Sequence, residues 1–301
     1  MLVGTQLCNY AKISSMISSI QAIILGALQG ITELFPVSSL GHSVILPKLL
    51  GWNGVDQHNA LFLVFLVATH LATSLVLFGF FFKDWVLIIK GIFRSLAIRK
   101  IETTDTYAKL GWLIIVSSIP AGILGLLFEE KLKALFASPR AVAIFLILNG
   151  FMLYAAELLR KKSKTQLGGG SDVEIAKMTW LQAVKIGCAQ CIALIPGFSR
   201  TGSTIGGGLT VGLDQESSAR FSFLIATPII FAASLLKLPE LITPEARGAI
   251  YPILLGSLAS ALTAYFSIRF LTRYFQTKKL TPFAVYCIVA GALATLILFV
   301  R

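Results

Sequence analysis

Long apolar runs separated by short polar segments form the main pattern along the chain. Six of these runs contain at most one charged residue each and are long enough to cross a bilayer, at roughly 59–82, 108–128, 141–159, 221–238, 248–268 and 280–300. About 20 helical residues span the hydrocarbon core, because each residue adds about 1.5 Å to a helix. The pattern therefore predicts an all-α integral membrane protein with about six transmembrane helices.

A further apolar stretch, residues 13–32, leads into a polar segment instead of a loop. This first polar break has the sequence QGITELFPVSSLGH and covers residues 29–42. Gln29 and Glu33 are four positions apart, so they share one face of a helix, and Pro36 should end that helix. Irregular backbone at membrane depth must be buried or line a cavity, so we expect a re-entrant helical hairpin here.

A second polar break, PGFSRTGSTIGGG, covers residues 196–208. The apolar pieces that flank it, 186–195 and 205–213, are each too short to cross a bilayer alone. A second re-entrant hairpin is therefore expected.

In the first break, Ser38 or Ser39 can cap the following helix, whose free N–H groups would then form a natural anion site.

The two breaks belong to an internal repeat. Residues 21–42 fall on residues 182–203 without a gap when they are shifted by 161 positions, and FLVAT at 65–69 matches FLIAT at 223–227. Shared apolar composition is the alternative explanation, but polar Gln and Ser and small Gly carry most of the identities. The identical pairs are Gln21–Gln182, Ala22–Ala183, Gly26–Gly187, Gln29–Gln190, Ile31–Ile192, Ser38–Ser199 and Gly41–Gly202.

The repeat suggests how the chain is divided. We expect a single polytopic domain over residues 1–301, with repeat one at about 16–159 and repeat two at about 178–300, joined by a loop at 160–177. Each repeat would hold one hairpin and three spans, and an odd number of spans inverts the second repeat. Inverted repeats bring their broken helices together near the midplane, so the two breaks should face each other.

Lys and Arg are distributed unevenly among the loops. Loops 83–107, 160–180 and 272–280 carry 5, 5 and 3 of them, whereas the alternating loops 129–140 and 239–247 carry 3 and 1. Cytoplasmic loops are enriched in positive residues, so the first set is expected to be cytoplasmic. The first hairpin then opens outward, and the second opens toward the cytoplasm.

Composition adds three limits. The net charge of +12 does not indicate nucleic-acid binding, because the basic residues lie in short loops between apolar runs. The four cysteines give no disulfide framework, and packing explains the Cys188-x-x-Cys191 pair in an apolar helix. Residues 1–15 lack an apolar core of signal-peptide length, and Met16 is an alternative start.

Together the two breaks hold the groups needed for attack on a phosphoryl group. Arg200 can bind phosphate through two parallel hydrogen bonds. Ser39 is the expected nucleophile, with Glu33 or His42 as its base and the other as a leaving-group acid or metal ligand. His42 is the rival nucleophile, because an imidazole titrates near neutrality. A Mg²⁺ or Ca²⁺ ion on Glu33 would help to neutralise the phosphoryl charge.

Further polar side chains of both breaks are expected to bind substrate: Gln29, Ser38, Ser199, Thr201, Ser203 and Thr204. The main candidates also have structural explanations, which are helix capping for Ser38 and Ser39, an interface role for His42, and an ion pair with Glu33 for Arg200. His58 and His70 have no comparable polar neighbourhood in the sequence and are expected to be structural.

At these residues the chain resembles the undecaprenyl pyrophosphate phosphatase family, the bacterial bacitracin-resistance membrane proteins. Three features carry the resemblance, namely Gln29-x-x-x-Glu33, PVSSLGH at 36–42 and PGFSRTGST at 196–204. The resemblance covers nearly the whole chain from about residue 16. It implies hydrolysis of undecaprenyl pyrophosphate to the monophosphate and inorganic phosphate, which recycles the lipid carrier for cell-wall synthesis and confers bacitracin resistance.

The resemblance also implies a divalent cation, an inner-membrane location, an outward-facing site and a homodimer. The functional positions of the family fall on Glu33, Ser39, His42 and Arg200, and its supporting positions fall on Ser38, Ser199 and Thr204. Many members have Glu where this chain has Gln29, so the chain has one charge fewer at a two-carboxylate metal site.

Two classes of function remain. The first is the phosphatase, and the second is a transporter or flippase for an anionic polyprenyl lipid, since inverted repeats with broken helices are also a transporter architecture. A carrier needs no nucleophile beside a base, so the Ser-Ser-x-Gly-His segment favours the enzyme.

Overall fold

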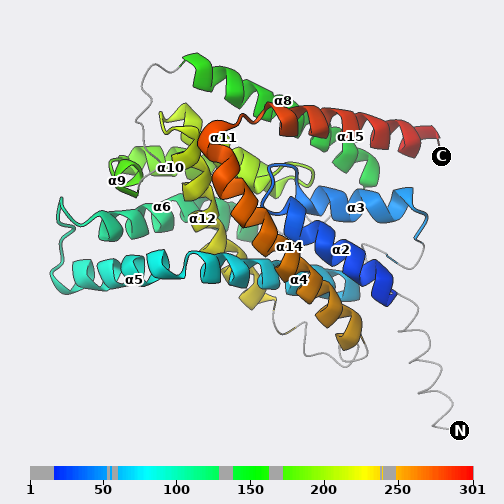
Figure 1. Ribbon diagram of the computed structural model, residues 1–301, viewed down its shortest axis with the longest axis horizontal. Coiled ribbons are helices and arrows are strands. Elements are labelled where there is room, and N and C mark those ends of the chain that lie inside the picture. Colours follow the sequence, from blue (N-terminus) through cyan, green and yellow to red (C-terminus); the bar gives the residue numbers. More distant parts are fainter. Residues whose placement is uncertain are drawn as a thin grey trace, which may run out of the picture.

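The computed structural model describes residues 17–52, 55, 60–128, 138–162, 172–237, 239 and 249–300. Over these ranges the chain is helical and has no strand. Six helices are long and apolar enough to cross a membrane, which confirms the expected multi-pass membrane protein. They are α4 (Ala60–Phe80), α6 (Thr106–Leu127), α8 (Pro139–Lys162), α12 (Gln215–Leu236), α14 (Ile250–Thr277) and α15 (Thr281–Val300) (Figure 1).

Shorter helices flank the two polar breaks. The first break lies between α2 (Ser19–Thr32) and α3 (Ser39–Leu49). The second lies between α10 (Trp180–Cys191), which continues as the 3₁₀ turn η1 (Ile192–Leu194), and α11 (Arg200–Thr210). The re-entrant placement of these hairpins in a membrane and the inversion of the repeats stay predictions.

The first helix of each hairpin begins with the same capping chemistry. The Ser18 side chain accepts a hydrogen bond from the Gln21 backbone, and the Gln21 side chain accepts one from the Ser18 backbone. Thr179 and Gln182 form the same capping box at the start of α10. Such a box satisfies two free N–H groups at once. The two boxes are 161 positions apart, which supports the repeat.

The helices also pair in a reciprocal way. α2 packs along α14 and α10 packs along α6, while α4 packs on α12 and α8 packs on α15. A Cβ on Gly26 would lie 2.0 Å from the carbonyl oxygen of Gly256, and a Cβ on Gly187 would lie 2.4 Å from that of Ser117. Only glycine permits such close contact between helices. Gly26 and Gly187, which the repeat relates to each other, therefore each allow the first helix of a hairpin to pack closely on a long helix.

Two predicted loops contain helices. Residues 83–107 include α5 (Phe82–Ala97), which begins directly after α4 and packs against α6. The interval 160–177 includes the end of α8 and the short helix α9 (Asp172–Ala176), and its residues 163–171 lie outside the described part. The sequence did not predict α5 as a helix, because its basic residues give the segment the composition of a polar loop.

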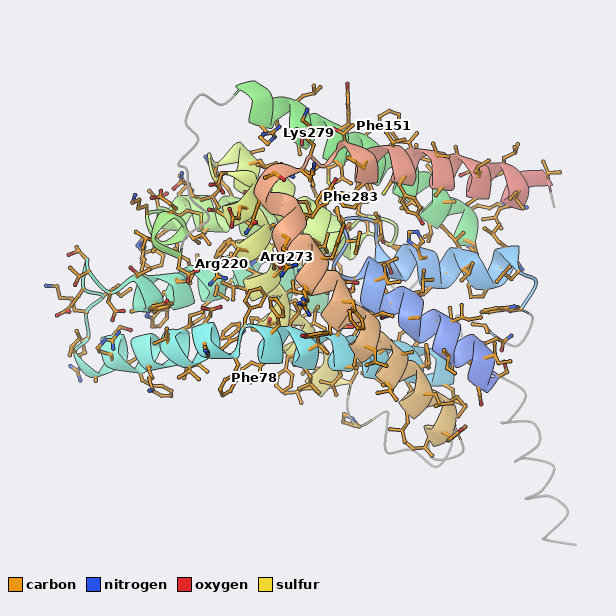
Figure 2. The ribbon with its side chains drawn as sticks, viewed as in Figure 1. Phe78, Phe151, Arg220, Arg273, Lys279 and Phe283 are labelled. Carbon is orange, nitrogen blue, oxygen red and sulfur yellow. The ribbon has the colours of Figure 1, made fainter. Side chains whose placement is uncertain are left out.

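Two spans also differ in length from the expectation. α12 begins at Gln215 and not near 221, so Arg220, which is labelled in Figure 2, lies within the helix. Its charge is paired inside the structure, with Asp84 of α5 at 3.1 Å and with Asp172 of α9 at 2.7 Å. α14 extends to Thr277 and not to about 268. In both cases the arginines within the helix ended the apolar run without ending the helix.

Candidate active site

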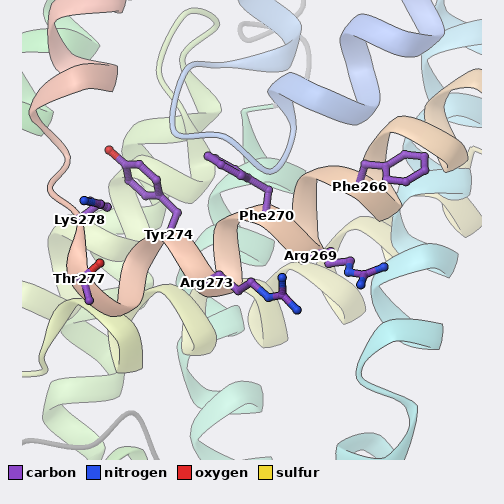
Figure 3. A pocket seen from close by; sticks show the side chains of 7 residues that line it. All are labelled: Phe266, Arg269, Phe270, Arg273, Tyr274, Thr277 and Lys278. Atoms are coloured by element: carbon purple, nitrogen blue, oxygen red, sulfur yellow. The ribbon is translucent and has the colours of Figure 1, made fainter.

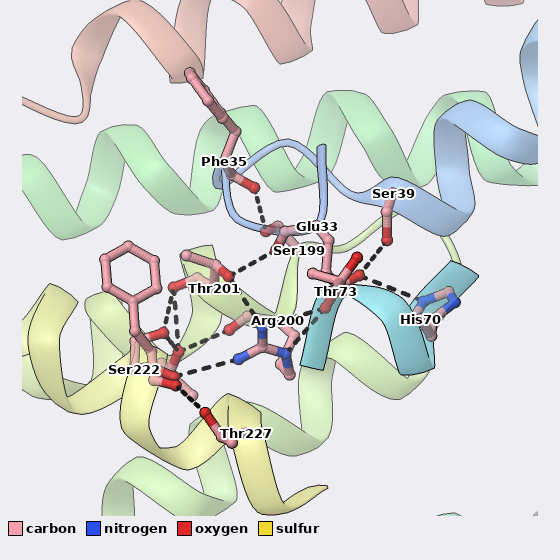
Figure 4. Close-up of polar contacts among 12 residues, drawn as sticks. Glu33, Phe35, Ser39, His70, Thr73, Ser199, Arg200, Thr201, Ser222 and Thr227 are labelled. Carbon is pink, nitrogen blue, oxygen red and sulfur yellow. Dashed lines mark hydrogen bonds and ion pairs between the residues drawn. The ribbon is translucent and has the colours of Figure 1, made fainter. Parts of the chain in front are cut away.

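The two breaks lie against each other, as the repeat predicts (Figure 4). The Thr201 hydroxyl donates a hydrogen bond to the carbonyl oxygen of Glu33 at 3.0 Å, and the Ser199 hydroxyl donates one to that of Phe35 at 3.5 Å. A Cβ on Gly202 would lie 3.3 Å from the Cβ of Pro36. The polar residues of the two halves therefore form one cluster.

Asn149 of α8 holds the two breaks together. Its side chain is fully buried, and its Nδ2 donates to the carbonyl oxygen of Pro36 at 3.1 Å. Its Oδ1 accepts from the backbone N–H of Ser199 at 2.9 Å. Sequence reasoning missed this residue, although a lone amide inside an apolar span is itself a signal, since polar groups at membrane depth need partners.

Glu33 is the centre of the cluster and is almost fully buried at the end of α2. Its Oε2 accepts hydrogen bonds from the Ser39 hydroxyl at 2.5 Å and from Gln29 Nε2 at 3.2 Å. Its Oε1 accepts from Arg200 Nη2 at 3.2 Å and Nε at 3.4 Å. Ser39 and Arg200, the nucleophile and the arginine expected from the sequence, thus both contact Glu33, and the alternative Arg200–Glu33 ion pair is present as well.

His70 of α4 completes the cluster. Its Nε2 lies 3.4 Å from Glu33 Oε2, and its Nδ1 lies 2.7 Å from the carbonyl oxygen of Leu66 (Figure 4). Both partners are acceptors, so the ring can donate to both only when both nitrogens carry a proton. The carboxylate of Glu33 is therefore in position to pair with a protonated His70. His70 has no polar neighbourhood in the sequence, and α4 brings it to Glu33 only in the folded chain. The expectation that His70 is structural stays a prediction, and His58 lies outside the described residues.

His42 points elsewhere. Its Nδ1 lies 2.7 Å from the carbonyl oxygen of Ser38, and its Nε2 lies 2.8 Å from the hydroxyl of Tyr286 on α15. The two rings also stack, with centroids 5.7 Å apart. Nδ1 then donates to the carbonyl while Nε2 accepts from the tyrosine, which a neutral imidazole can do. In this arrangement the side chain that is hydrogen-bonded to the Ser39 hydroxyl is Glu33 and not His42.

The backbone of Ser38 turns the chain toward Glu33. Ser38 caps α3 by accepting a hydrogen bond from the Gly41 N–H at 3.2 Å, and its φ is +70°, which is unusual for a residue other than glycine. Its repeat partner Ser199 caps α11 with a φ of −90°. Such strain costs roughly 1–3 kcal/mol and concentrates at functional sites. Here it orients Ser39, the first residue of α3.

Arg200 begins α11 and is fixed from several sides. Its Nη1 donates to the carbonyl oxygen of Ser222 at 3.3 Å, and its Nη2 donates to the Thr201 hydroxyl at 3.3 Å. The Thr204 hydroxyl bonds to that of Ser222 and donates to the carbonyl oxygen of Arg200 at 2.8 Å. Thr201 and Thr204 thus support the arginine from within its own helix.

Ser203 differs from its neighbours. Its hydroxyl lies 3.6 Å from the sulfur of Met152 on α8, so it packs against that helix and away from the Glu33 cluster. A helix turns by about 100° per residue, and successive residues therefore face different neighbours. The expectation that Ser203 binds substrate is not supported by this position.

Oxygen ligands for a divalent cation are few. The described residues contain no group of three or more His, Cys, Asp or Glu side chains that could hold a metal. However, Gln29 is fully buried and its Oε1 has no hydrogen-bond partner, while its Nε2 touches Glu33. Mg²⁺ is commonly bound by one or two carboxylates together with the substrate's phosphates. The donor set fits a cation shared with a phosphate ligand, and it does not form a cage by itself.

The family model for the bacitracin resistance protein BacA matches residues 22–293, which include both breaks. The chain belongs to the BacA family. Similar proteins include the undecaprenyl-diphosphatase of Mycolicibacterium paratuberculosis, which is 46% identical over 95% of this chain and 99% of its own length. Undecaprenyl-diphosphatase 2 of Frankia alni is 40% identical over 92% and 96% of the two chains. The undecaprenyl-diphosphatase of Granulibacter bethesdensis is 44% identical over 93% and 96%.

All residues of the Glu33 cluster lie within the range that the BacA family model matches. The resemblance noted from three short motifs thus extends over the whole membrane domain. The cluster of this BacA family member contains one carboxylate, two positive side chains and a hydroxyl, which is a suitable set for an anionic phosphoryl ligand.

Proposed function

We propose that this protein is an undecaprenyl-diphosphatase, which hydrolyses undecaprenyl pyrophosphate to the monophosphate and inorganic phosphate. The observation that carries the proposal is the 2.5 Å hydrogen bond from the Ser39 hydroxyl to Glu33, a nucleophile paired with a base inside a cationic cluster. By this reaction the protein recycles the lipid carrier for cell-wall synthesis and confers resistance to bacitracin. The similar proteins named undecaprenyl-diphosphatase support the choice of substrate.

In the reaction we propose, the Ser39 oxygen attacks the terminal phosphorus of the pyrophosphate, and its proton passes to Glu33 Oε2. The bond between that phosphorus and the bridging oxygen breaks, and the polyprenyl monophosphate leaves. A water molecule then attacks the phosphoserine while Glu33 takes its proton, and inorganic phosphate leaves. Glu33 releases the proton of Ser39 to solvent before the second step, and in the second step it passes the proton of the water to the departing Ser39 oxygen, so both residues return to their starting state.

Arg200 has a second task in this scheme. In the free protein its guanidinium is bound to Glu33, 3.2 Å from Oε1. When Glu33 gains the proton of Ser39, its attraction for the guanidinium falls, and the N–H groups become available to the phosphoryl oxygens. Arginine donates to phosphate through a planar pair of hydrogen bonds and stays charged in a dry site. The guanidinium charge of Arg200 can then stabilise the negative charge that develops on the phosphoryl oxygens in the transition state.

We also propose a Mg²⁺ or Ca²⁺ ion for this site, held by Glu33 and the unpartnered Oε1 of Gln29 together with the pyrophosphate. Such an ion supplies neutralisation of the phosphate charge. Because this chain has an amide at position 29, Glu33 provides its only carboxylate ligand there, and we expect weaker cation binding than with a glutamate. We place the protein in the bacterial inner membrane as a homodimer, with the site facing outward, in line with the basic-loop pattern and the resemblance.

The test is phosphate release by the purified protein in detergent, with undecaprenyl pyrophosphate as substrate. Release by the wild type and loss of release by Ser39→Ala would support the enzyme. Movement of the intact lipid across sealed vesicles, without any phosphate release by the wild type, would support the flippase and would remove the proposal.

A further inference from the structure

A groove of about 510 Å³ lies along the last turns of α14, and no residue of the two breaks lines it. Figure 3 shows its lining, which is aromatic and basic and contains no acidic residue. The residues are Phe266, Arg269, Phe270, Arg273, Tyr274, Thr277 and Lys278. Arg269 and Arg273 are one helical turn apart, so both guanidinium groups serve the same groove.

The charges of the groove are not neutralised within the described part of the chain. The side chains of Arg269, Arg273 and Lys278 are exposed and form no hydrogen bond or ion pair with any described residue. Glu216 of α12 approaches this end of α14, but it bonds Gln276, which does not line the groove. An anionic group from outside the chain would therefore find several free donors.

The groove lies at the end of a lipid-facing stripe. Leu254, Leu258, Leu262 and Phe266 follow one another at intervals of four along α14, and their exposed fractions are 59%, 59%, 54% and 65%. On a spanning helix, such an apolar unpartnered face contacts lipid chains. Arg269 is eleven residues beyond Leu258, or about 16 Å along the helix, which is about the depth of one leaflet. The guanidinium groups therefore lie at headgroup level when the stripe lies in hydrocarbon.

We propose that this groove binds the headgroup of an anionic phospholipid from the cytoplasmic leaflet, with its acyl chains along the Leu254–Phe266 stripe. Guanidinium groups bind phosphate oxygens in pairs, and the adjacent aromatic rings belong at the membrane interface. The basic-loop count places residues 272–280 on the cytoplasmic side, where anionic lipids attract basic clusters. Charge complementarity and the apolar stripe together specify a phosphate group that carries fatty chains.

One wall of the groove reaches the catalytic segment. The Phe270 ring stacks on Phe35, with centroids 5.9 Å apart and planes within 8°, and Phe35 also meets Phe283 edge to face at 5.5 Å. Phe35 is two residues after Glu33 in the first break. A lipid that fixes Phe270 should therefore also stabilise the break, which gives binding a readout in thermal stability.

The proposal is tested by native mass spectrometry of protein that has been stripped of lipid and titrated with phosphatidylglycerol or phosphatidylcholine. The groove variant is Arg269→Gln/Arg273→Gln. The matched control is Lys90→Gln/Lys100→Gln, which removes two exposed positive charges from α5 and the turn after it. Size-exclusion profiles without added lipid establish that both variants are folded.

We expect the wild type and the control to retain phosphatidylglycerol over phosphatidylcholine by at least about tenfold, the ratio that 1.4 kcal/mol produces, and to melt at a higher temperature when it is added. The groove variant should lose both effects. Equal retention of phosphatidylglycerol by the groove variant and the control, or no preference in the wild type, would overturn the proposal. Displacement of the phospholipid by an equal amount of polyprenyl monophosphate would instead assign the groove to that lipid.

Discussion

Glu33 is a buried carboxylate that meets four side chains: Gln29, Ser39, His70 and Arg200. A buried charge is costly unless it is paired and hydrogen-bonded, and here two positive groups offset one negative group. One positive charge is left over when His70 is protonated. The cluster therefore favours an anionic ligand even though it already contains the base. Removal of Arg200 or a protonated His70 should change both its charge and its geometry, whereas removal of Gln29 or Ser39 should change its geometry alone.

Ser39→Ala should leave almost no turnover, because it removes the hydroxyl that we propose as the nucleophile and that is hydrogen-bonded to Glu33. We expect a loss of at least about a hundredfold in kcat, with the protein still folded. His42→Ala should keep a measurable fraction of activity, since its ring bonds Tyr286 and not the Ser39–Glu33 pair. Phosphate-release assays on both variants distinguish a serine nucleophile from a histidine nucleophile. The reverse order of activities, with a trapped phosphohistidine, would assign the nucleophile to His42.

Arg200→Lys should be severely impaired although the charge is kept. A lysine cannot reproduce the planar pair of hydrogen bonds to phosphate, nor the simultaneous contacts to Glu33 and the Ser222 carbonyl. The loss in kcat/KM should be at least about tenfold, or roughly 1.4 kcal/mol of transition-state stabilisation. Steady-state kinetics measure it. If the lysine variant were nearly as active as the wild type, Arg200 would only balance the charge of Glu33.

His70 is a positioning residue in this scheme, and its protonation can be followed through the pH profile. The imidazole must carry two protons to bond both Glu33 and the Leu66 carbonyl. As the pH rises the ring loses a proton, so kcat of the wild type should fall on the alkaline side. His70→Gln should lower kcat by about tenfold and lack this limb. An unchanged alkaline limb in the variant would show that another group titrates.

At the scale of elements, each hairpin is built from a capped helix, a break and a second capped helix. Close glycine contacts hold α2 on α14 and α10 on α6, where a side chain would meet a backbone oxygen. The strained Ser38 backbone occurs in the first hairpin only, and Ser199 has an ordinary conformation at the corresponding place. The two hairpins thus share a scaffold and differ in the backbone conformation of the serine that caps the second helix.

Gly26→Ala should destabilise the protein, because the new Cβ would lie 2.0 Å from the Gly256 carbonyl oxygen and would push α2 from α14. Overpacking of this kind costs roughly 1–3 kcal/mol. Gly122→Ala in α6 is the matched control, since nothing lies within 4 Å of its Cβ and alanine favours the helix. Thermal melting in detergent should separate the two. Equal melting temperatures would mean that α2 and α14 do not need close contact.

At the scale of the whole molecule, the reciprocal helix pairing places the two breaks side by side in the centre of the bundle. α14 crosses the front of the bundle in Figure 1, with α2 alongside it, while α8 and α15 lie along one edge. The orientation of this bundle in the membrane rests on the basic-loop count, to which α5 contributes three of its positive residues, Lys83, Lys90 and Arg94.

Cysteine labelling tests that orientation. In a background without native cysteines, Leu50→Cys at the end of α3 should react with an impermeant reagent on intact cells, because the first hairpin is expected to open outward. Lys100→Cys after α5 should react only after the membrane is permeabilised. Both positions are exposed, so accessibility on the protein does not limit either reaction. The opposite labelling pattern would reverse the topology.

The six spans were predictable from the sequence because they depend on local order. An apolar run of bilayer length forms a helix wherever it lies, and all six expected spans appear as helices. The serine caps and the shared capping boxes likewise involve residues three positions apart. The helix α5 was not predicted from the sequence, because an amphipathic helix with lysines and arginines has the composition of a loop.

The composition of the Glu33 cluster was decided by the tertiary structure. Spacing along one helix suggested that His42 serves Ser39, but α15 draws His42 to Tyr286, and α4 brings His70 to Glu33 instead. Asn149 joins the breaks for the same reason. Sequence periodicity describes only which residues share a face of one element. Arg200 and Glu33 are 167 positions apart along the chain. Contacts between such distant residues depend on how the helices pack.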